Sequence, residues 1–454
     1  MSRPMFRKSL KTASSAVLRP RLQYQQIPKS QTFATIAPVT SSRNHKVIVI
    51  GGGSAGLAIS HQLLRSGRFT PHDIAIIDPA TWHHYQPGWT LVGGGLKTKE
   101  VLRRPMHDLI GPNLKFYNDG VRTFTPDDNT VTLTNGDRVT YEQLVVVPGI
   151  QIQYNKIKGL PEALAAPESM VSSIYGYDTC DKVFRTIQQL RQGVALFTQP
   201  TGVVKCAGAP QKAMWLALDY WKRRGLYNVD QPQSKIQISF ATGLPGMFGV
   251  PKYSTKLEEL RRGNGVEGLF QHDLVEIDGN TAVFAQLNGN GLVRKHFDLL
   301  HVVPKMGPHD CVKDSALANE AGFVEVDETT MRHTRYANVW SAGDASSLPT
   351  SKTMAAVAAQ APVLVRNLLR VMDGNEPSAR YDGYTSCPLV TEYGKVLLVE
   401  FKYGGVPKET FGMLGIDQAV PRRAFYYMKK HFFPWVYYSS MVKGTWGGSQ
   451  GWIR

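Results

Sequence analysis

The sequence predicts an α/β protein, because two segments alternate apolar strands with helices and the last part of the chain differs from both. The first segment has a strand at residues 47–50, the glycine run 51–56 and a helix at 57–64. The second segment begins with a strand at 194–197, continues through a helix at about 211–223 and returns in a strand at 236–240. A strand, a tight turn and a helix in this order build a dinucleotide-binding unit. We therefore expect two Rossmann-like (FAD/NAD(P)-binding type) domains plus a C-terminal membrane-attachment region.

The glycine run has the spacing G-x-G-x-x-G of a dinucleotide-binding turn. Gly51 permits the turn, Gly53 lets the backbone approach a pyrophosphate, and Gly56 lets the helix pack against the strand. Ser54 and Ala55 complete the turn at the start of the helix, whose free amides and partial positive charge attract an anion. The motif predicts a dinucleotide site, the alternative being a glycine-rich loop without a ligand.

Two later strand ends support this prediction. The strand at 74–77 ends in Asp78, which is placed to accept the ribose hydroxyls of a dinucleotide. The buried strand at 144–147 stops at Pro148 and Gly149. That ending resembles the point where the chain leaves the flavin domain in the two-dinucleotide-domain disulfide oxidoreductases.

A further strand end favours FAD over a nicotinamide cofactor. A strand runs into Gly343 and Asp344, about 290 residues after the first glycine motif. This resembles a flavin motif in which the aspartate accepts a hydrogen bond from the ribitol chain. An Ala-rich helix is expected from Lys352 through Gln360, and its N-terminus at Lys352 and Thr353 would face the flavin and stabilise its reduced anion. A plain buried helix is the alternative.

The second strand–helix unit lacks the phosphate-binding turn. After the strand at 194–197, residues 198–210 read TQPTGVVKCAGAP, with two prolines and a cysteine where the glycines are expected. A nicotinamide cofactor is therefore a poor candidate for the reductant. We expect the FAD-binding domain at 45–160 and 300–375, the second Rossmann-like domain at 161–299 and a C-terminal domain at 376–454.

The N-terminal segment has the composition of a mitochondrial targeting peptide. Residues 1–44 contain eight basic side chains and no acidic one, which is half of the formal net charge of +16. Arg-rich, Ser-rich and acid-poor leaders of this kind direct proteins to mitochondria, and a solvated tail is the alternative. No later stretch offers the roughly 18 uncharged apolar residues that a spanning helix needs. Nothing beyond this leader suggests nucleic-acid binding.

Two of the four cysteines have surroundings that suit redox chemistry. Cys206 follows Lys205 and precedes a helix containing Lys212, so cationic groups and the helix start favour its thiolate. Cys387 precedes Pro388, which favours an extended conformation, and we expect it on an accessible loop. Taken alone, a cysteine of either kind is more often an inert buried side chain.

The other two cysteines, Cys180 and Cys311, are expected to be structural. Cys180 lies between two aspartates, which oppose thiolate formation. The chain has no C-x-x-C pair and no zinc-ligand spacing, so we expect neither a metal site nor a fold built on disulfides.

Four segments closely resemble those of mitochondrial sulfide:quinone oxidoreductases, and the resemblance runs from about residue 45 to the C-terminus. They are residues 85–93, 204–212, 348–353 and 381–390. The segment 85–93 adds Gln86 to the flavin site. The expected flavin-binding residues are thus Gly51, Gly53, Ser54, Ala55, Gly56, Asp78, Gln86, Pro148, Gly149, Gly343, Asp344, Lys352 and Thr353.

The resemblance implies a FAD-dependent enzyme of the mitochondrial inner membrane. Hydrogen sulfide attacks a disulfide or sulfur-bridged form of the Cys206 and Cys387 pair, leaving a persulfide on one cysteine and a thiolate on the other. A small acceptor such as sulfite or glutathione removes the sulfane sulfur, and two electrons pass through FAD to ubiquinone. The family suggests Cys387 as the persulfide carrier and Cys206 as the flavin-side thiolate.

The C-terminal region suggests how the quinone is reached. Residues 425–438 are dense in aromatic side chains and interrupted by lysines, a composition that suits the headgroup layer of a membrane. We expect monotopic attachment, with an aromatic homodimer interface as the alternative. Gln360 and Phe401 are candidates for the quinone pocket.

Two other functions compete with this interpretation. A type II NADH:quinone dehydrogenase shares flavin, quinone and membrane attachment, but the broken second glycine motif and the cysteine pair argue against it. A redox-sensing flavoprotein without turnover, acting as an interaction partner, is disfavoured because both cysteines are present.

Overall fold

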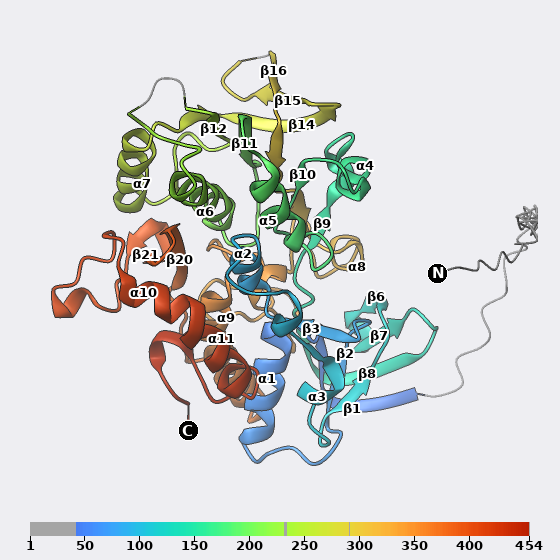
Figure 1. Cartoon of the computed structure of the whole chain (residues 1–454). Helices are drawn as coiled ribbons and strands as arrows, with labels where there is room; N and C mark the ends of the chain where they lie inside the picture. The colour runs from blue at the N-terminus through green and yellow to red at the C-terminus, as the bar shows by residue number, and fades with distance from the viewer. Residues whose placement is uncertain (1–41, 231–233, 290, 454) are drawn as a thin grey trace, which may run out of the picture. The chain divides into compact units, whose positions relative to one another are not determined.

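The computed structural model describes residues 42–230, 234–289 and 291–453 (Figure 1). These residues belong to one structural unit, which spans residues 39–454. The expected targeting peptide at 1–44 therefore lies almost wholly outside the described residues. Strand β1 begins at Ser42, two residues before the expected end of the leader.

The first sheet has seven strands in the order β5-β2-β1-β8-β7-β6, with β19 paired to β8. Its parallel part is β5 (Lys115–Tyr117), β2 (Ile74–Ile77), β1 (Ser42–Ile50), β8 (Arg138–Val146) and β19 (Val339–Trp340). Strands β7 (Thr130–Leu133) and β6 (Val121–Thr125) continue it in antiparallel pairing. The apolar runs at 47–50 and 74–77 are fully buried, as in parallel strands covered on both faces.

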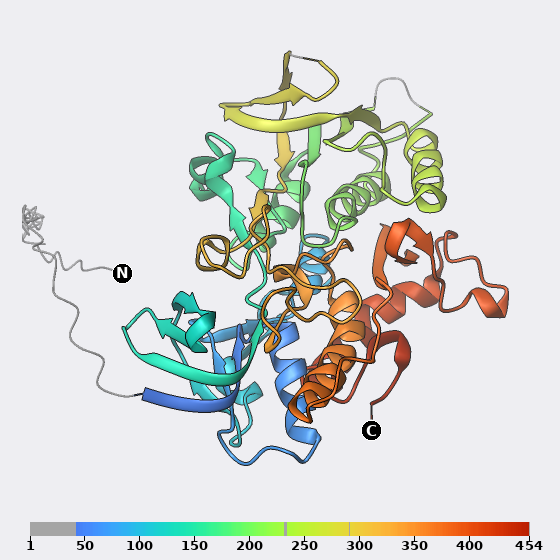
Figure 2. The same ribbon diagram turned by 180° about the vertical axis from the view of Figure 1, so that it is seen from behind.

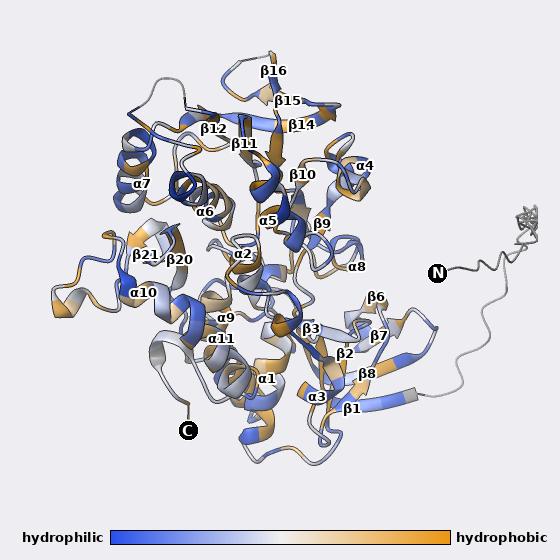
Figure 3. Cartoon of the chain, viewed as in Figure 1, coloured by the Kyte–Doolittle hydropathy of each residue, from blue (hydrophilic) through white to orange (hydrophobic). Residues whose placement is uncertain are grey.

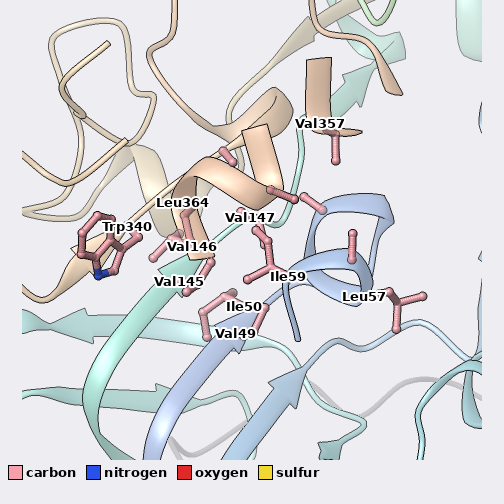
Figure 4. Close-up of a cluster of buried hydrophobic side chains, with 14 of the residues drawn as sticks. Val49, Ile50, Leu57, Ile59, Val145, Val146, Val147, Trp340, Val357 and Leu364 are labelled. Carbon is pink, nitrogen blue, oxygen red and sulfur yellow. The ribbon is translucent and has the colours of Figure 1, made fainter. Parts of the chain in front are cut away.

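Helices α1 (Ser54–Arg65) and α9 (Met354–Met372) pack against this sheet. Figure 4 shows Val49 and Ile50 of β1 beside Leu57 and Ile59 of α1, with Leu364 of α9 among the same cluster. Residues from both ends of the chain thus share one core. That core fixes the turn between β1 and α1 relative to the N-terminus of α9.

The second sheet is parallel and has the order β10-β17-β11-β12-β13. Its strands are β10 (Val171–Ser172), β17 (Leu299–His301), β11 (Gly193–Gln199), β12 (Ile236–Thr242) and β13 (Glu267–Phe270). Helices α5 (Cys180–Gln189), α6 (Ala209–Arg223) and α7 (Pro251–Gly263) accompany it, as Figure 2 shows from behind. The strands expected at 194–197 and 236–240 are present and pair in parallel along their whole length.

An antiparallel sheet that the sequence did not predict lies next in the chain. It consists of β14 (His272–Asp278), β15 (Thr281–Gln286) and β16 (Leu292–His296). Shorter elements connect the parts: β3 (Trp82–His84) with β4 (Arg103–Pro105), β9 (Gln151–Gln153) with β18 (Lys305–Gly307), and the helices α2 (Trp89–Val92), α3 (Met106–Leu109), α4 (Leu160–Ala165) and α8 (Asp310–Lys313).

The C-terminal region starts with a three-stranded antiparallel sheet and ends in short helical turns. The strands are β20 (Thr385–Glu392), β21 (Lys395–Lys402) and β22 (Val406–Pro407). The turns are α10 (Arg423–Tyr427), a π-helical turn (Met428–Phe432), α11 (Phe433–Val436) and a second π-helical turn (Tyr437–Met441). Within the described ranges no helix combines the length and the apolar character needed to cross a membrane.

The expectation that Cys387 lies on an accessible loop is wrong. Cys387 is in β20, opposite Val399 of β21, and only 2% of it is exposed. The extended conformation that Pro388 favours is satisfied here by a strand. Because β20 pairs with β21 alone, it is an edge strand, where a residue without an N–H group is tolerated.

Candidate active site

One cavity of about 420 Å³ brings together residues from the first sheet, the second sheet and the C-terminal region. Most of the flavin-binding residues expected from the sequence line it: Gly53, Ser54, Ala55, Gln86, Pro148, Gly149, Gly343, Asp344, Lys352 and Thr353. Gly51, Gly56 and Asp78 are not among the lining residues, and they act on the shape of the turn instead.

The glycines of the β1–α1 turn have different surroundings. Gly51 has a φ of 99°, and a Cβ there would lie 2.5 Å from the carbonyl oxygen of Val147. A Cβ at Gly56 would lie 1.8 Å from the carbonyl oxygen of Gly51. A Cβ at Gly53 would meet nothing within 4 Å, because this residue faces the cavity. The turn is therefore tightly packed on its protein side and open on its cavity side.

Asp78 supports the turn directly. One carboxylate oxygen accepts a hydrogen bond from the Gly52 amide at 2.6 Å, and the other accepts one from the Ala80 amide at 2.7 Å. Burial raises the pKa of Asp78 despite these two hydrogen bonds. A contact between Asp78 and the ribose of a dinucleotide stays a prediction.

Polar groups on the cavity wall fit a flavin dinucleotide. The buried Trp89 indole N–H finds no acceptor among the described residues, so it is available to a ligand. Burial raises the pKa of Asp344, and the lysines Lys205 and Lys352 oppose that shift. Burial also lowers the pKa of Lys352 to about 8. With the open backbone at Gly53 and Gly149, these groups could hold the phosphates, ribitol and ring of FAD.

The two candidate redox cysteines meet at the wall of this cavity although they are 181 residues apart. Their Sγ atoms are 2.9 Å from each other, within hydrogen-bonding distance. Cys206 lies in the loop between β11 and α6 with a φ of 57°, and its amide donates to the carbonyl oxygen of Lys352 at 2.8 Å. The loop of the second sheet is thereby attached to the N-terminal side of α9. Of the two cysteines, Cys206 lines the cavity.

The charges around the pair favour one thiolate on Cys206. The hydrogen bond from the Cys387 thiol lowers the pKa of Cys206, and the ammonium groups of Lys212 and Lys429 lower it further. Lys212 Nζ is 3.4 Å from Cys206 Sγ. The same hydrogen bond and burial raise the pKa of Cys387. The two pKa shifts have opposite directions, so the thiolate is favoured on Cys206 and the thiol on Cys387.

Lys429 is a site residue that the sequence analysis did not identify. It is buried in the π-helical turn 428–432 and lines the cavity. Burial, followed by repulsion from Lys212, lowers the pKa of Lys429 to about 7. The lysines between the aromatics at 425–438 were the available signal, but the sequence did not show which of them points inward.

The surroundings of Cys180 and Cys311 disfavour a thiolate. Burial and the neighbouring Asp181 raise the pKa of Cys180 to about 12. Burial also raises the pKa of Cys311. Neither lines the cavity. No group of three or more metal-ligating side chains is found in the part of the chain that the structure describes.

The two quinone candidates from the sequence do not line the cavity. Gln360 is buried and accepts a hydrogen bond from the Gly343 amide at 2.7 Å. Phe401 packs edge-on against Phe248, with ring centroids 6.2 Å apart. The apolar residues of the C-terminal region that line the cavity include Pro388, Leu398, Phe411, Met428, Phe432, Phe433 and Trp446.

The loop after β11 is closed where a nucleotide-binding domain would bind phosphate. The Thr201 amide and hydroxyl donate to the carboxylate of Asp273 at 3.3 and 2.7 Å. Lys305 forms an ion pair with the same carboxylate. A Cβ at Gly243 would lie 2.4 Å from the Thr201 side chain. The carboxylate of Asp273 therefore already uses the hydrogen-bond donors of Thr201.

Known proteins resemble this chain in sequence and in fold. Residues 45–197 match the family described as pyridine nucleotide-disulphide oxidoreductase. The mitochondrial sulfide:quinone oxidoreductase of Schizosaccharomyces pombe is 44% identical over 91% of this chain and 93% of its own length. That of Dictyostelium discoideum is 42% identical over 89% of this chain and 87% of its own. The crystal structure of the sulfide:quinone oxidoreductase of Aquifex aeolicus superimposes with a TM-score of 0.71 at 19% identity, covering 87% of this chain and 92% of that one, and shows the same fold.

Proposed function

The chain belongs to the sulfide:quinone oxidoreductase family, a family of flavin-dependent enzymes, and on that premise we propose that it oxidises sulfide through Cys206 and Cys387. It is a mitochondrial flavoprotein, and the proposed site is the mitochondrial inner membrane. The cofactor is FAD and the electron acceptor is ubiquinone. The observation that carries the proposal is the pair of sulfur atoms 2.9 Å apart on the wall of the cavity.

The sulfur chemistry needs both cysteines. In the oxidised enzyme the hydrosulfide ion attacks one sulfur of the Cys206–Cys387 disulfide, the S–S bond breaks, and a persulfide and a thiolate form. Sulfite or glutathione then takes the outer sulfur and leaves a second thiolate. When the disulfide forms again, the two thiolates give up two electrons, which the bound flavin would pass to the quinone. With sulfite as acceptor, the proton of the persulfide and one proton from solvent complete the quinol.

The surroundings assign different tasks to the two cysteines. Cys206 lines the cavity and holds the thiolate, so we assign it to the flavin side. Cys387 is 2% exposed and would carry the persulfide, shielded from solvent. Lys212 and Lys429 stabilise the negative charge as it forms. Because its pKa is lowered to about 7, Lys429 is also suited to accept and return a proton near neutral pH.

The cavity wall would bind and orient the cofactor. When bound, FAD accepts two electrons and passes them to the quinone. The amides at the start of α1 would hold its phosphates, and Asp344 would accept a hydrogen bond from its ribitol chain. Lys352, at the N-terminal side of α9, would stabilise negative charge on the ring.

We place the quinone ring against the apolar part of the cavity beside the C-terminal turns. Phe411, Met428 and Phe433 line this part, and Phe432 lines it while remaining 38% exposed. Trp435 and Trp452 are more than half exposed nearby, with their ring centroids 6.4 Å apart. Exposed aromatic rings next to lysines suit a membrane surface, from which an apolar quinone could enter.

A second apolar surface supports membrane attachment. Met413 and Leu414 are 95% and 73% exposed in the loop before α10. The tip of this loop is coloured as hydrophobic at the left edge of Figure 3. Exposed side chains of this size are expected to lie in an apolar environment.

The alternative in which NADH supplies the electrons is not favoured. The loop after β11 is filled by the contact of Thr201 with Asp273, so its amide is not available to a pyrophosphate. A site that lacks turnover is also disfavoured, because the two cysteines are in reacting distance.

Steady-state quinone reduction tests the proposal. The full chain, purified with FAD, is given sulfide, sulfite and a soluble ubiquinone analogue, and thiosulfate and quinol are measured together. We expect one thiosulfate per quinol, and a loss of activity on the order of 10³-fold in Cys206→Ser and in Cys387→Ser. Cys311→Ser is the matched control and should keep the activity. Full activity in either of the first two variants would contradict the proposed role of the pair.

A further inference from the structure

The C-terminal segment reaches the phosphate-binding turn through one buried tyrosine. Tyr437, in the second π-helical turn, is fully buried. Its hydroxyl oxygen lies 2.7 Å from Ser54 Oγ and 2.6 Å from His83 Nε2. The other ring nitrogen of His83, Nδ1, lies 3.0 Å from the carbonyl oxygen of Gly52. These contacts join residues on both sides of Gly53, the open position of the turn.

The direction of each hydrogen bond in the series that links Ser54, Tyr437, His83 and Gly52 is determined. The Gly52 carbonyl can only accept, so His83 Nδ1 carries a proton. Burial lowers the pKa of His83 to about 4, so the ring is neutral at pH 7 and Nε2 is an acceptor. The Tyr437 hydroxyl therefore donates to His83, and the Ser54 hydroxyl donates to Tyr437. Each polar side-chain atom in this series of hydrogen bonds thus has a partner.

The surrounding packing holds Tyr437 in place. Its ring lies nearly parallel to that of His83, with centroids 5.8 Å apart, and its centroid is 4.8 Å from that of Tyr85. Farther along, the segment lies directly on α1, where a Cβ at Gly444 would be 2.6 Å from the Gln62 amide nitrogen. The segment is thus docked on the helix that begins at the phosphate-binding turn.

We propose that Tyr437 is a positioning residue that clamps the turn at Gly52 and Ser54 and so sets the affinity for FAD. The C-terminal segment is then part of the cofactor site as well as of the surface for the membrane. On one short stretch Trp435 is 58% exposed while Tyr437 is fully buried. This inference rests on the proposed binding of FAD at this turn.

The clamp has a simple energetic consequence. The turn needs amides oriented toward the phosphates before the cofactor arrives, because ordering a flexible loop on binding reduces affinity. With the hydroxyl of Tyr437 removed, Ser54 and His83 lose their shared partner and the turn gains freedom. The cost then appears in FAD binding and not only in the stability of the fold.

The test compares Tyr437→Phe with Tyr438→Phe in the full chain. The Tyr438 hydroxyl donates to the Leu102 carbonyl oxygen at 2.8 Å and makes no hydrogen bond to the turn. Tyr438→Phe therefore removes the same chemical group from the adjacent residue and serves as the control. Apoprotein is titrated with FAD and flavin fluorescence gives the Kd. We expect the Kd to rise about tenfold in Tyr437→Phe and to stay within twofold of wild type in Tyr438→Phe.

A double-mutant cycle with His83→Leu separates the clamp from general loosening. Both substitutions break the same series of hydrogen bonds. The Kd of the double variant should therefore exceed that of either single variant by less than twofold. Equal Kd values in wild type and Tyr437→Phe, or full additivity in the cycle, would overturn the clamp. If wild-type protein itself binds no FAD, the cofactor assignment falls, which is a different result from equal binding.

Discussion

The loops after β1 and after β11 have equivalent positions in their sheets but differ in the groups that they expose to the cavity. Both follow a parallel strand and precede a helix, α1 in one case and α6 in the other. The first loop is open at Gly53 and lines the cavity with free backbone. In the second loop the amide and hydroxyl of Thr201 are already bonded to Asp273, and the loop presents Cys206 to the cavity instead.

This difference shows that the fold supplies a position and the loop supplies the chemistry. The carboxyl ends of parallel strands are where α/β proteins bind ligands. In the first unit glycine leaves room for a phosphate. In the second unit a carboxylate from β14 accepts hydrogen bonds from Thr201, and the loop holds a thiol near Lys212 to which we assign the sulfur chemistry.

The largest effect is expected from filling the open position of the first loop. Gly53→Val adds a side chain where a Cβ meets no protein atom, and Gly53 has an ordinary φ of −72°, so the fold should be retained. The added methyl groups occupy the space proposed for the phosphates. We expect the affinity for FAD to fall about 100-fold, measured by titrating apoprotein with FAD.

Gly202→Val makes the same change in the second loop. A Cβ there also meets no atom within 4 Å, but Gly202 has a φ of 82° and does not line the cavity. We expect a loss of stability of about 1 kcal/mol with unchanged FAD affinity. Equal FAD affinity in both variants would contradict the difference between the loops.

A second effect is expected from removing the internal acid. Asp273→Ala leaves Lys305 without its partner and the Thr201 amide without an acceptor. We expect the free energy of unfolding in urea to fall by about 2 kcal/mol, and by less in Asp273→Asn. NADH should still fail to reduce the flavin, because Pro200 and Thr201 remain in the loop. Rapid reduction by NADH in Asp273→Ala would show that this acid alone had closed the site.

The smallest effect concerns the charge beside the thiolate. Lys429→Met removes a cation that lowers the pKa of Cys206, so that pKa should rise. The charge on Lys429 is present below about pH 7 and is lost above it, so the difference from wild type should be largest below pH 7. The pH dependence of Cys206 alkylation by iodoacetamide, followed by mass spectrometry, measures it. Lys430→Met is the control, and an equal shift there would argue against a specific role for Lys429.

The core elements were predictable because their signals are local. The strand expected at 74–77 is β2, and the helix expected at 211–223 is α6 with two more residues at its start. Apolar runs between glycine-rich turns determine such elements without help from distant residues. The antiparallel strands β14 to β16 escaped prediction because their burial does not follow one apolar pattern: β16 has no buried residue, and β15 has three buried residues in a row.

Site residues were predictable only where they belong to a single local sequence motif. The glycine turn and the segments around Asp344 and Lys352 indicated their own lining residues. Lys429 and Phe411 come from the C-terminal region, which folds back onto the cavity through irregular π-helical turns. The contact of Tyr437 with Ser54 joins residues 383 positions apart, and no local pattern could show it.

The most direct test of the central claim is an anaerobic titration of the flavin with its two candidate reductants. Wild-type protein with FAD receives sulfide plus sulfite in one cuvette and NADH in another, and the flavin absorbance is followed. We expect sulfide to bleach the flavin at about one equivalent and ubiquinone analogue to restore it, while NADH leaves it oxidised. Bleaching by NADH without bleaching by sulfide would contradict the account. It would mean that NADH bound at the loop after β11, and not the cysteine pair, supplies the electrons.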